Sequence, residues 1–418
     1  YIKGSEWESE VLNGGLVAVD FYSTECPPCE ALAAKFEPLS EVYGRDVKFI
    51  KIFRQENRDL ALSLGIKSSP TLLFYKNGNR VGDFLSGAIK RKEITKNLDE
   101  MIGEERAKAI RSTMKSSKSE YDVMILGGGP AGLAAAIYAA QAKAKTVIVD
   151  KALPGGQISI THQVSNYPGF IDPVPGYMLA HYMSEQAAKA GVFFKSAVDI
   201  TSVDLKAKAV VADEFETVKA KKIIIATGAS PRPLGIPGEK EYRGKGISYC
   251  GTCDAKYFDG KEVIVIGGGD TAIEESLFIA KFASKLSIFY RADKPRAKAE
   301  IQELAAKTPN ITLVPKHKPL EISKESDGKM SVLFENGANG DKSKFTADGI
   351  FVFVGMNPNT ADFNGTLETD EWGYIKIDKE MRTSIPDVFA VGDVAEKPIR
   401  QITVAVADGT IAAICATR

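Results

Sequence analysis

The chain has 418 residues, which is too many for one ordinary hydrophobic core and predicts two or three domains. Its 54 basic residues balance its 54 acidic ones without a dense run of Lys or Arg, so neither nucleic acid nor an anionic membrane surface is an expected partner. The longest apolar helical run, residues 131–140, is too short to cross a bilayer, and the expected location is the cytoplasm.

The five cysteines are too few for a disulfide framework, which leaves catalytic or metal-binding use for those that are paired. Two Cys-x-x-Cys pairs occur, Cys26 with Cys29 and Cys250 with Cys253. We expect no metal, because each pair stands in a motif of its own and neither has a histidine near it. Cys415 lies in an apolar helical stretch and is expected in the core.

The first segment predicts alternating strands and helices. Residues 16–22 form an apolar run broken only by Asp20, as expected of a central strand covered on both faces. Cys26-Pro27-Pro28-Cys29 then opens a helix, because a proline suits a first turn in which its missing N–H would have no partner. A sulfur at a helix N-terminus meets unpaired N–H groups that lower its pKa, so Cys26 is the expected nucleophile.

Two further strands are predicted at residues 47–52 and 71–75, and the second follows Ser68-Ser69-Pro70, where Pro70 is a candidate for a cis peptide bond. Together with the buried aspartate and the helix-opening cysteines, this pattern resembles the thioredoxin fold over residues 1–103. The resemblance implies that Pro70 lies in cis beside the disulfide. It also implies that Asp20 exchanges protons with Cys29 through water, with Lys51 nearby, and burial in an apolar strand would raise the pKa of Asp20 toward neutrality.

One position departs from the pattern of that family. Where the family usually has Trp before the first cysteine, this chain has Glu25. A carboxylate next to Cys26 opposes thiolate formation and repels acidic partner surfaces. A narrower range of partners is therefore expected than for thioredoxins at large.

Residues 104–120 are polar and charged, with almost no apolar stripe, and they predict a linker between domains. As a coil they would average about 20 to 25 Å between their ends, which permits a mobile N-terminal domain. A helix over residues 104–115, packed rigidly against the next domain, is the alternative.

A dinucleotide-binding fingerprint follows the linker. Residues 121–126 form an apolar strand, the next six residues fit G-x-G-x-x-G, and an Ala-rich helix follows. Residues 146–149 form the next strand, and an acid comes directly after it. The glycines let a pyrophosphate reach the helix N-terminus, and the acid can hold ribose hydroxyls. The predicted binding residues are Gly127, Gly129, Pro130, Ala131, Gly132 and Asp150.

A second fingerprint follows the predicted strand at residues 262–266, with Ala272 in place of the third glycine. The strand at residues 286–290 ends without an acid and is followed by Arg291 and Arg296, which suit a 2′-phosphate and favour NADPH over NADH. The binding residues predicted here are Gly267, Gly269, Asp270, Thr271, Arg291 and Arg296.

Several further motifs occur in order along the chain. They are Gly155-Gly156-Gln157, Asn166-Tyr167-Pro168-Gly169, Ala226-Thr227-Gly228-Ala229, Cys250-Gly251-Thr252-Cys253-Asp254, Gly355-Met356-Asn357-Pro358-Asn359-Thr360, Ala390-Val391-Gly392-Asp393-Val394 and Arg400-Gln401. Together with a cysteine pair placed just before the second fingerprint, they resemble the small bacterial-type thioredoxin reductases over residues 121–418.

The resemblance implies an α/β protein in which a thioredoxin fold is followed by two Rossmann-like dinucleotide-binding domains. An FAD domain, residues 121–231 and 354–418, would be split by an inserted NAD(P)H domain, residues 232–353, that carries the second cysteine pair. Beyond the first glycine loop, the residues expected to hold FAD are Gly156, Gln157, Asn166, Ala226, Thr227, Gly228, Gly392, Asp393, Arg400 and Gln401.

By the same resemblance, electrons pass from NAD(P)H through FAD to Cys250 and Cys253, then to Cys26 and Cys29, and finally to disulfide substrates. Cys253 would contact the flavin, Cys250 would attack the outgoing disulfide, and Asp254 would supply or accept the proton. The fused domain raises the effective concentration of the acceptor. A homodimer is expected.

Alternatives remain open from the sequence. Ala292 stands where the family usually has another arginine, which weakens the choice of NADPH over NADH and keeps ferredoxin open as a donor. The final acceptor is either protein disulfides at large or a peroxiredoxin, and a redox sensor without turnover is the rival from another class. His162 precedes the Asn166 motif and is a candidate to approach the flavin.

Overall fold

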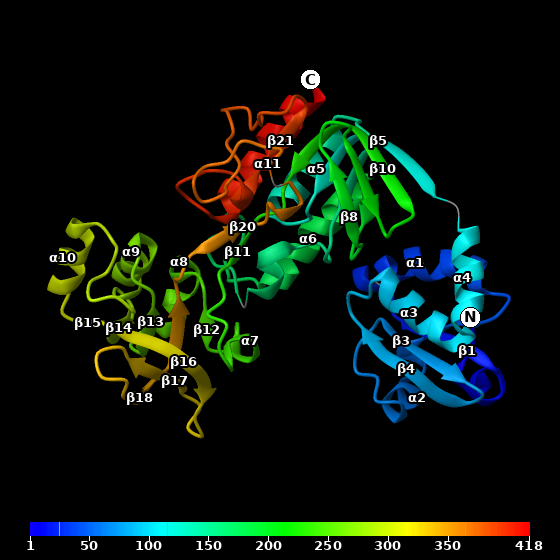
Figure 1. Cartoon of the computed structure of the whole chain (residues 1–418), viewed down its shortest axis with the longest axis horizontal. Coiled ribbons are helices and arrows are strands. Elements are labelled where there is room, and N and C mark those ends of the chain that lie inside the picture. The colour runs from blue at the N-terminus through cyan, green and yellow to red at the C-terminus, as the bar shows by residue number, and fades with distance from the viewer. Residues whose placement is uncertain (25, 115, 162, 364) are drawn as a thin grey trace.

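The computed structural model describes residues 1–24, 26–114, 116–161, 163–363 and 365–418. Along the chain it builds a small N-terminal α/β part, a large α/β part with a central sheet, and a third α/β part inserted into the second (Figure 1). The predicted class, a thioredoxin fold followed by Rossmann-like folds, is confirmed.

The N-terminal part contains a four-stranded sheet in the order β2-β1-β3-β4. Its middle strand β1 is buried along its interior, which explains its apolar run, and it pairs parallel to β2 and antiparallel to β3. The strands are β1 (Leu16–Tyr22), β2 (Lys48–Phe53), β3 (Thr71–Lys76) and β4 (Asn79–Ser86), and the helices are α1 (Pro27–Tyr43), α2 (Arg58–Ser63) and α3 (Arg91–Ile102).

Of the two possibilities for the predicted linker, the structure has the helix. α4 (Glu104–Thr113) packs against α3 of the N-terminal part. Its Ala107 and Ile110 are buried, and Arg106 forms a bidentate pair with Asp46 at 2.9 to 3.1 Å. Two buried apolar side chains and two ion pairs, Arg106 with Asp46 and Arg111 with Asp99, therefore hold this helix, although its polar composition predicted a linker.

The N-terminal part also touches the second part through a set of residues that we name the interdomain contact. Lys35 of α1 is buried and donates to the carbonyl oxygens of Ile89, at 3.1 Å, and Ser196, at 2.9 Å. Lys90 and Lys92 both pair with the carboxylate of Asp199. The contact comprises Lys35, Ile89, Lys90, Arg91 and Lys92 on one side and Ser196, Asp199 and Phe215 on the other.

The second part has a central sheet in the order β7-β6-β5-β10-β9-β8, with β21 also pairing with β10. Strands β7, β6, β5, β10 and β21 run parallel, whereas β8 and β9 form an antiparallel extension. The strands are β5 (Ser117–Leu126), β6 (Thr146–Val149), β7 (Phe193–Lys195), β8 (Ile200–Asp204), β9 (Ala209–Ala212), β10 (Glu216–Ile225) and β21 (Val388–Ala390).

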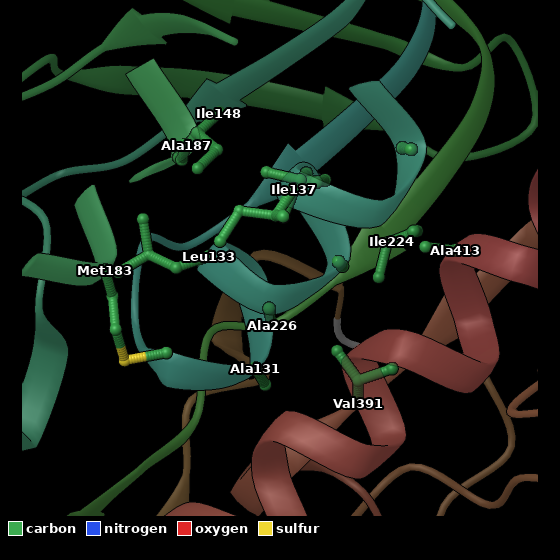
Figure 2. Packing of buried hydrophobic residues seen from close by; sticks show 14 of the residues in the cluster. Ala131, Leu133, Ile137, Ile148, Met183, Ala187, Ile224, Ala226, Val391 and Ala413 are labelled. Atoms are coloured by element: carbon green, nitrogen blue, oxygen red, sulfur yellow. The ribbon is translucent and has the colours of Figure 1, made fainter. Parts of the chain in front are cut away.

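Helix α5 (Pro130–Gln141) lies at the centre of this part, against the sheet and against α11 (Ile402–Thr417). Figure 2 shows Leu133 and Ile137 of α5 pointing into the cluster that Ile224 of β10 joins. A Cβ on Gly409 of α11 would lie 2.1 Å from the carbonyl oxygen of Ala131, so the two helices meet closely only because this residue is glycine. α6 (Gly176–Lys189) packs against α5 as well.

The third part contains the five-stranded sheet β12-β19-β13-β14-β15 and the three-stranded sheet β16-β17-β18. Its strands are β12 (Ile247–Ser248), β13 (Glu262–Ile266), β14 (Lys285–Phe289), β15 (Ile311–Val314), β16 (His317–Lys324), β17 (Met330–Asn336), β18 (Lys342–Ala347) and β19 (Gly349–Val352). Its helices are α7 (Glu239–Tyr242), α8 (Gly251–Asp254), α9 (Asp270–Ile279) and α10 (Ala299–Lys307).

Two antiparallel strands, β11 (Ala229–Pro231) and β20 (Met356–Pro358), carry the chain into and out of the third part. They lie between it and the central sheet of the second part (Figure 1). In the portion of the chain that the structure describes, no helix has the length and apolar character needed to cross a membrane.

Candidate active site

The N-terminal dithiol lies at the start of α1, where Cys26 and Cys29 form a disulfide. Cys26 is the N-cap residue, and its sulfur accepts a hydrogen bond from the backbone N–H of Cys29 at 3.3 Å. Cys26 is partly exposed, whereas Cys29 is only 6% exposed. The geometry therefore suits Cys26, the predicted nucleophile, for attack from outside.

The loop before β3 lies beside this disulfide. The Ser69–Pro70 peptide bond is cis, which confirms the prediction for Pro70. The sulfur of Cys26 is 3.7 Å from the carbonyl oxygen of Ser69. The side chain of Ser69 accepts hydrogen bonds from the hydroxyl of Ser23 and from Nε of Arg54, each at 2.8 Å. Sequence reasoning missed this polar group because its residues come from three separate segments.

Asp20 lies in the middle of β1 and is fully buried. Among the described residues neither of its carboxylate oxygens has a hydrogen-bond partner. Burial raises the pKa of Asp20 to about 7, although the positive charge of Lys51 opposes the rise. Such a carboxyl group holds a proton near neutral pH, as the predicted proton exchange requires.

Two residues of interest fall outside the description. Glu25, predicted to oppose thiolate formation, and His162, predicted to approach the flavin, both lie outside the described residues.

The second dithiol repeats the local geometry of the first. Cys250 and Cys253 form a disulfide at the start of α8, and the sulfur of Cys250 accepts from the backbone N–H of Cys253 at 3.2 Å. Ser248 donates to the carboxylate of Asp254 at 2.6 Å and accepts from the N–H of Cys250 at 3.1 Å. Ser248 thereby couples the predicted proton carrier to the predicted nucleophile.

Glu275 of α9 holds this short helix from the other side. Its carboxylate accepts from the backbone N–H of Thr252 at 2.9 Å and from the Thr252 hydroxyl at 3.2 Å. Glu275 and Ser248 were missed by sequence reasoning, because neither stands in a motif whose spacing reveals these contacts.

The first glycine loop joins β5 to α5 as predicted. Gly127 has φ of +107°, and a Cβ there would lie 2.4 Å from the carbonyl oxygen of Ala226. A Cβ on Gly132 would lie 2.0 Å from the carbonyl oxygen of Gly127, so the turn itself requires both glycines. A Cβ on Gly129, in contrast, would have no atom of the described residues nearer than 4.0 Å, which leaves room for a phosphate at the start of α5.

The other predicted FAD residues gather around this loop. Asp150 follows β6, and its carboxylate accepts from the N–H of Gly128 at 2.5 Å. Burial raises the pKa of Asp150, while backbone N–H groups oppose the rise. Asn166 donates to the side chain of Gln401 at 3.1 Å. Pro130 and Ala131 begin α5, Gly156 and Gln157 begin the short helix η4 (Gly156–Ile160), and Ala226, Thr227 and Gly228 follow β10.

The loop after β21 completes the site. The N–H of Gly392 donates to the carboxylate of Asp408 at 3.0 Å, and Lys397 pairs with the same carboxylate. Burial raises the pKa of Asp393, against the attraction of Arg400 and Lys397. Nε of Arg400 is buried without a hydrogen-bond partner among the described residues. An anionic group of a bound cofactor would meet this unused donor, so the residues present fit FAD.

The second glycine loop joins β13 to α9. A Cβ on Gly267 would lie 2.3 Å from the carbonyl oxygen of Phe353, whereas a Cβ on Gly269 would have no atom of the described residues within 4 Å. Asp270 accepts from the N–H of Lys298 at 2.7 Å, and Thr271 follows it in the first turn of α9. Arg291 and Arg296 are exposed, and no ion pair is formed by either within the described ranges. Their guanidinium groups are thus available to a phosphate.

The two dithiols are not brought together. In Figure 1 the helices that carry them, α8 and α1, lie in different parts of the molecule, with α6 between them in this view. The interdomain contact holds the N-terminal part against the loops that join β7 to β8 and β9 to β10, which lie apart from α8 (Figure 1).

The comparisons with known proteins agree with this site. A family model described as "Pyridine nucleotide-disulphide oxidoreductase" matches residues 121–409, and the model of the thioredoxin family matches residues 1–100. The chain belongs to the pyridine nucleotide-disulphide oxidoreductases. Like other enzymes of its family, this oxidoreductase uses FAD and NADPH, and its N-terminal part is a thioredoxin domain.

Three relatives illustrate the match. Thioredoxin reductase of Peptoclostridium acidaminophilum is 46% identical over 302 residues, which cover 70% of this oxidoreductase and 95% of that protein. Thioredoxin reductase of Peptoclostridium litorale is 46% identical over 307 residues, which cover 71% of this oxidoreductase and 96% of that protein. The crystal structure of thioredoxin reductase from Streptococcus pyogenes MGAS5005 matches with a TM-score of 0.67 at 38% identity. The match covers 72% of this oxidoreductase and 98% of that chain. No support emerges for the alternatives with ferredoxin, a peroxiredoxin or a sensor role.

Proposed function

We propose that the chain is a thioredoxin reductase that carries its own thioredoxin. The Cys250 and Cys253 dithiol would reduce the Cys26–Cys29 disulfide, and the resulting Cys26 and Cys29 dithiol would reduce disulfides of other proteins. The observation that carries the proposal is the shared geometry of the two pairs. Each is a disulfide whose first, partly exposed sulfur caps a helix and accepts an N–H bond from the second cysteine.

The proposed units are residues 1–103 for thioredoxin, 121–231 with 354–418 for FAD, and 232–353 for NADPH. The open space at Gly129 and the unused donor of Arg400 fit the pyrophosphate and charge of FAD, and the open space at Gly269 fits NADPH. When bound, these cofactors supply the electron pair that opens the Cys250–Cys253 disulfide.

The thiol steps follow from exposure and hydrogen bonding. The thiolate of Cys250 attacks the sulfur of Cys26, because Cys29 is buried, and Cys29 leaves as a thiolate. Asp20, which a pKa of about 7 leaves partly protonated at neutral pH, supplies the proton to Cys29. Cys253 then attacks Cys250, which re-forms the Cys250–Cys253 disulfide and frees Cys26 as a thiolate.

The arrangement in Figure 1 is a resting state in this proposal, because α1 and α8 lie apart. Transfer requires the thioredoxin domain to leave the interdomain contact and reach α8 of its own chain or of a second copy. We propose a homodimer and a cytoplasmic location, where reducing conditions keep such dithiols in turnover.

The test replaces Cys250 with Ser. NADPH should then still bleach the flavin, while the Cys26–Cys29 disulfide stays oxidised, as measured by alkylation and mass spectrometry after an anaerobic quench. Cys415→Ser, which removes the one cysteine outside both pairs, is the matched control and should behave as wild type. Reduction of Cys26–Cys29 at the wild-type rate in Cys250→Ser would exclude the relay.

A further inference from the structure

The surface next to Cys26 is polar and carries a positive charge. Ser69, whose carbonyl oxygen lies 3.7 Å from the Cys26 sulfur, separates that sulfur from the guanidinium of Arg54. The hydroxyl of Ser68, in the loop before β3, lies 2.9 Å from the hydroxyl of Ser86 at the end of β4, and both residues are exposed. A substrate that docks on Cys26 therefore meets hydroxyls and a cation.

Arg54 is held in place by one of its nitrogens, and among the described residues its other nitrogens have no partner. Nε donates to the hydroxyl oxygen of Ser69 at 2.8 Å, and Ser23 donates to the same oxygen at 2.8 Å. Across the described part of the chain, the two terminal nitrogens of Arg54 have no hydrogen-bond or ion-pair partner. Arg54 is half-buried, so its charge is less screened than that of a fully exposed side chain.

These contacts leave the planar end of a guanidinium beside the nucleophile. Such a fork matches the two oxygens of a carboxylate, and charge-assisted pairs of this kind are among the strong hydrogen bonds. We propose that Arg54 is a specificity-determining residue that selects disulfides with a carboxylate close to the attacked sulfur. The proposal rests on the proposed function, since it concerns the substrate that Cys26 reduces.

The reaction itself is ordinary disulfide exchange. The thiolate of Cys26 attacks one sulfur of the substrate disulfide, and the first substrate thiolate leaves and takes a proton. The Cys29 thiolate then attacks Cys26, re-forms the Cys26–Cys29 disulfide and releases the second substrate thiol. Arg54 takes no part in bond making but holds the carboxylate so that the sulfur lies in line with Cys26.

The charge of Glu25 works against the substrate preference that we propose for Arg54. Glu25 precedes Cys26 in the sequence and by its charge alone would disfavour an anionic substrate. A preference for anionic disulfides in the wild-type protein therefore requires a cation that outweighs it.

The experiment uses the full chain with FAD and excess NADPH. It compares kcat/KM for three small disulfides of similar length, which are anionic dithiodipropionate, neutral bis(2-hydroxyethyl) disulfide and cationic cystamine. The rate of the Cys26→Ser variant is subtracted, so that only turnover at the N-terminal dithiol counts. Arg54→Gln should lower kcat/KM for dithiodipropionate about tenfold relative to the neutral disulfide, and it should not lower that for cystamine.

Arg45→Gln removes the same charge from an exposed site on the loop after α1 and should leave kcat/KM for all three disulfides unchanged. Arg54→Lys keeps the charge without the fork and should retain part of the preference. An equal fall in kcat/KM for all three disulfides in Arg54→Gln would show that Arg54 only supports the loop before β3, and it would overturn the proposal. Failure of the wild-type protein to reduce any of them would instead refute the proposed function.

Discussion

Replacing Asp20 with Asn should remove a pH dependence from the stability of the thioredoxin domain. The carboxyl group is fully buried, and its pKa rises from 3.8 to about 7 on folding. This difference corresponds to about 4 kcal/mol between the folded and unfolded states. Between pH 4 and 7 the folded state binds more protons than the unfolded state at this group. The domain therefore loses stability as the pH rises through that range, and the full cost of the charge is present above pH 7.

The assay can follow this one domain in the full chain. The sequence has two tryptophans, Trp7 and Trp372, and Trp7 packs against Phe21 and Tyr75 in the core of the thioredoxin domain. In a Trp372→Phe background, fluorescence excited at the red edge reports unfolding of that domain alone. Urea unfolding is then measured from pH 4 to pH 8 with and without Asp20→Asn.

The difference in unfolding free energy between the two proteins isolates Asp20. Between pH 4 and pH 8, the unfolding free energy of Asp20→Asn should rise by about 4 kcal/mol relative to that of the protein with Asp20. A buried Asn without a partner costs stability too, but this cost is the same at every pH. Asp59→Asn, on an exposed site of α2, is the control and should show no such shift. A difference that stays constant with pH would refute the reasoning about Asp20.

Three further outcomes are expected from the nucleotide loops and the interdomain contact. Gly129→Ala should leave the fold intact, because the added Cβ would have no atom of the described residues nearer than 4.0 Å, and it should lower bound FAD as measured by absorbance. Gly269→Ala should raise KM for NADPH at unchanged FAD content, and loss of folding in either variant would contradict the open space at these positions. Arg291→Ala should raise KM for NADPH by about tenfold or more and should raise KM for NADH much less. An equal rise in KM for both nucleotides would exclude a contact between Arg291 and the 2′-phosphate. Asp199→Lys turns the two ion pairs of the interdomain contact into repulsions and should increase the radius of gyration measured by small-angle X-ray scattering. Asp204→Lys, which lies outside the contact, is the control. An unchanged radius of gyration in Asp199→Lys would show that the contact does not hold the thioredoxin domain.

Much of the fold could be predicted from the sequence where local backbone constraints decide it. β6 and β13 begin and end where the apolar runs predicted them, because each is a buried parallel strand followed by a turn signal. The loops with Gly127 and Gly267 also lie where predicted, since a side chain at either position would collide with a neighbouring carbonyl oxygen. These features depend on a few adjacent residues.

The remaining features depend on contacts between distant segments. The polar composition of α4 hid its packing, in which Ala107 and Ile110 are buried and two ion pairs reach Asp46 and Asp99. Ser248 and Glu275 hold the second dithiol from outside its motif, and Arg54 reaches Ser69 from the short helix η3 (Arg54–Glu56). No periodicity or spacing in one sequence reveals such pairs.

An anaerobic titration with NADPH tests the relay most directly. The wild-type chain should accept electrons into FAD and both disulfides, whereas the Cys26→Ser/Cys29→Ser double variant should consume one two-electron equivalent less per chain before NADPH accumulates. Equal consumption by the two proteins would show that electrons do not reach the thioredoxin domain and would contradict the account.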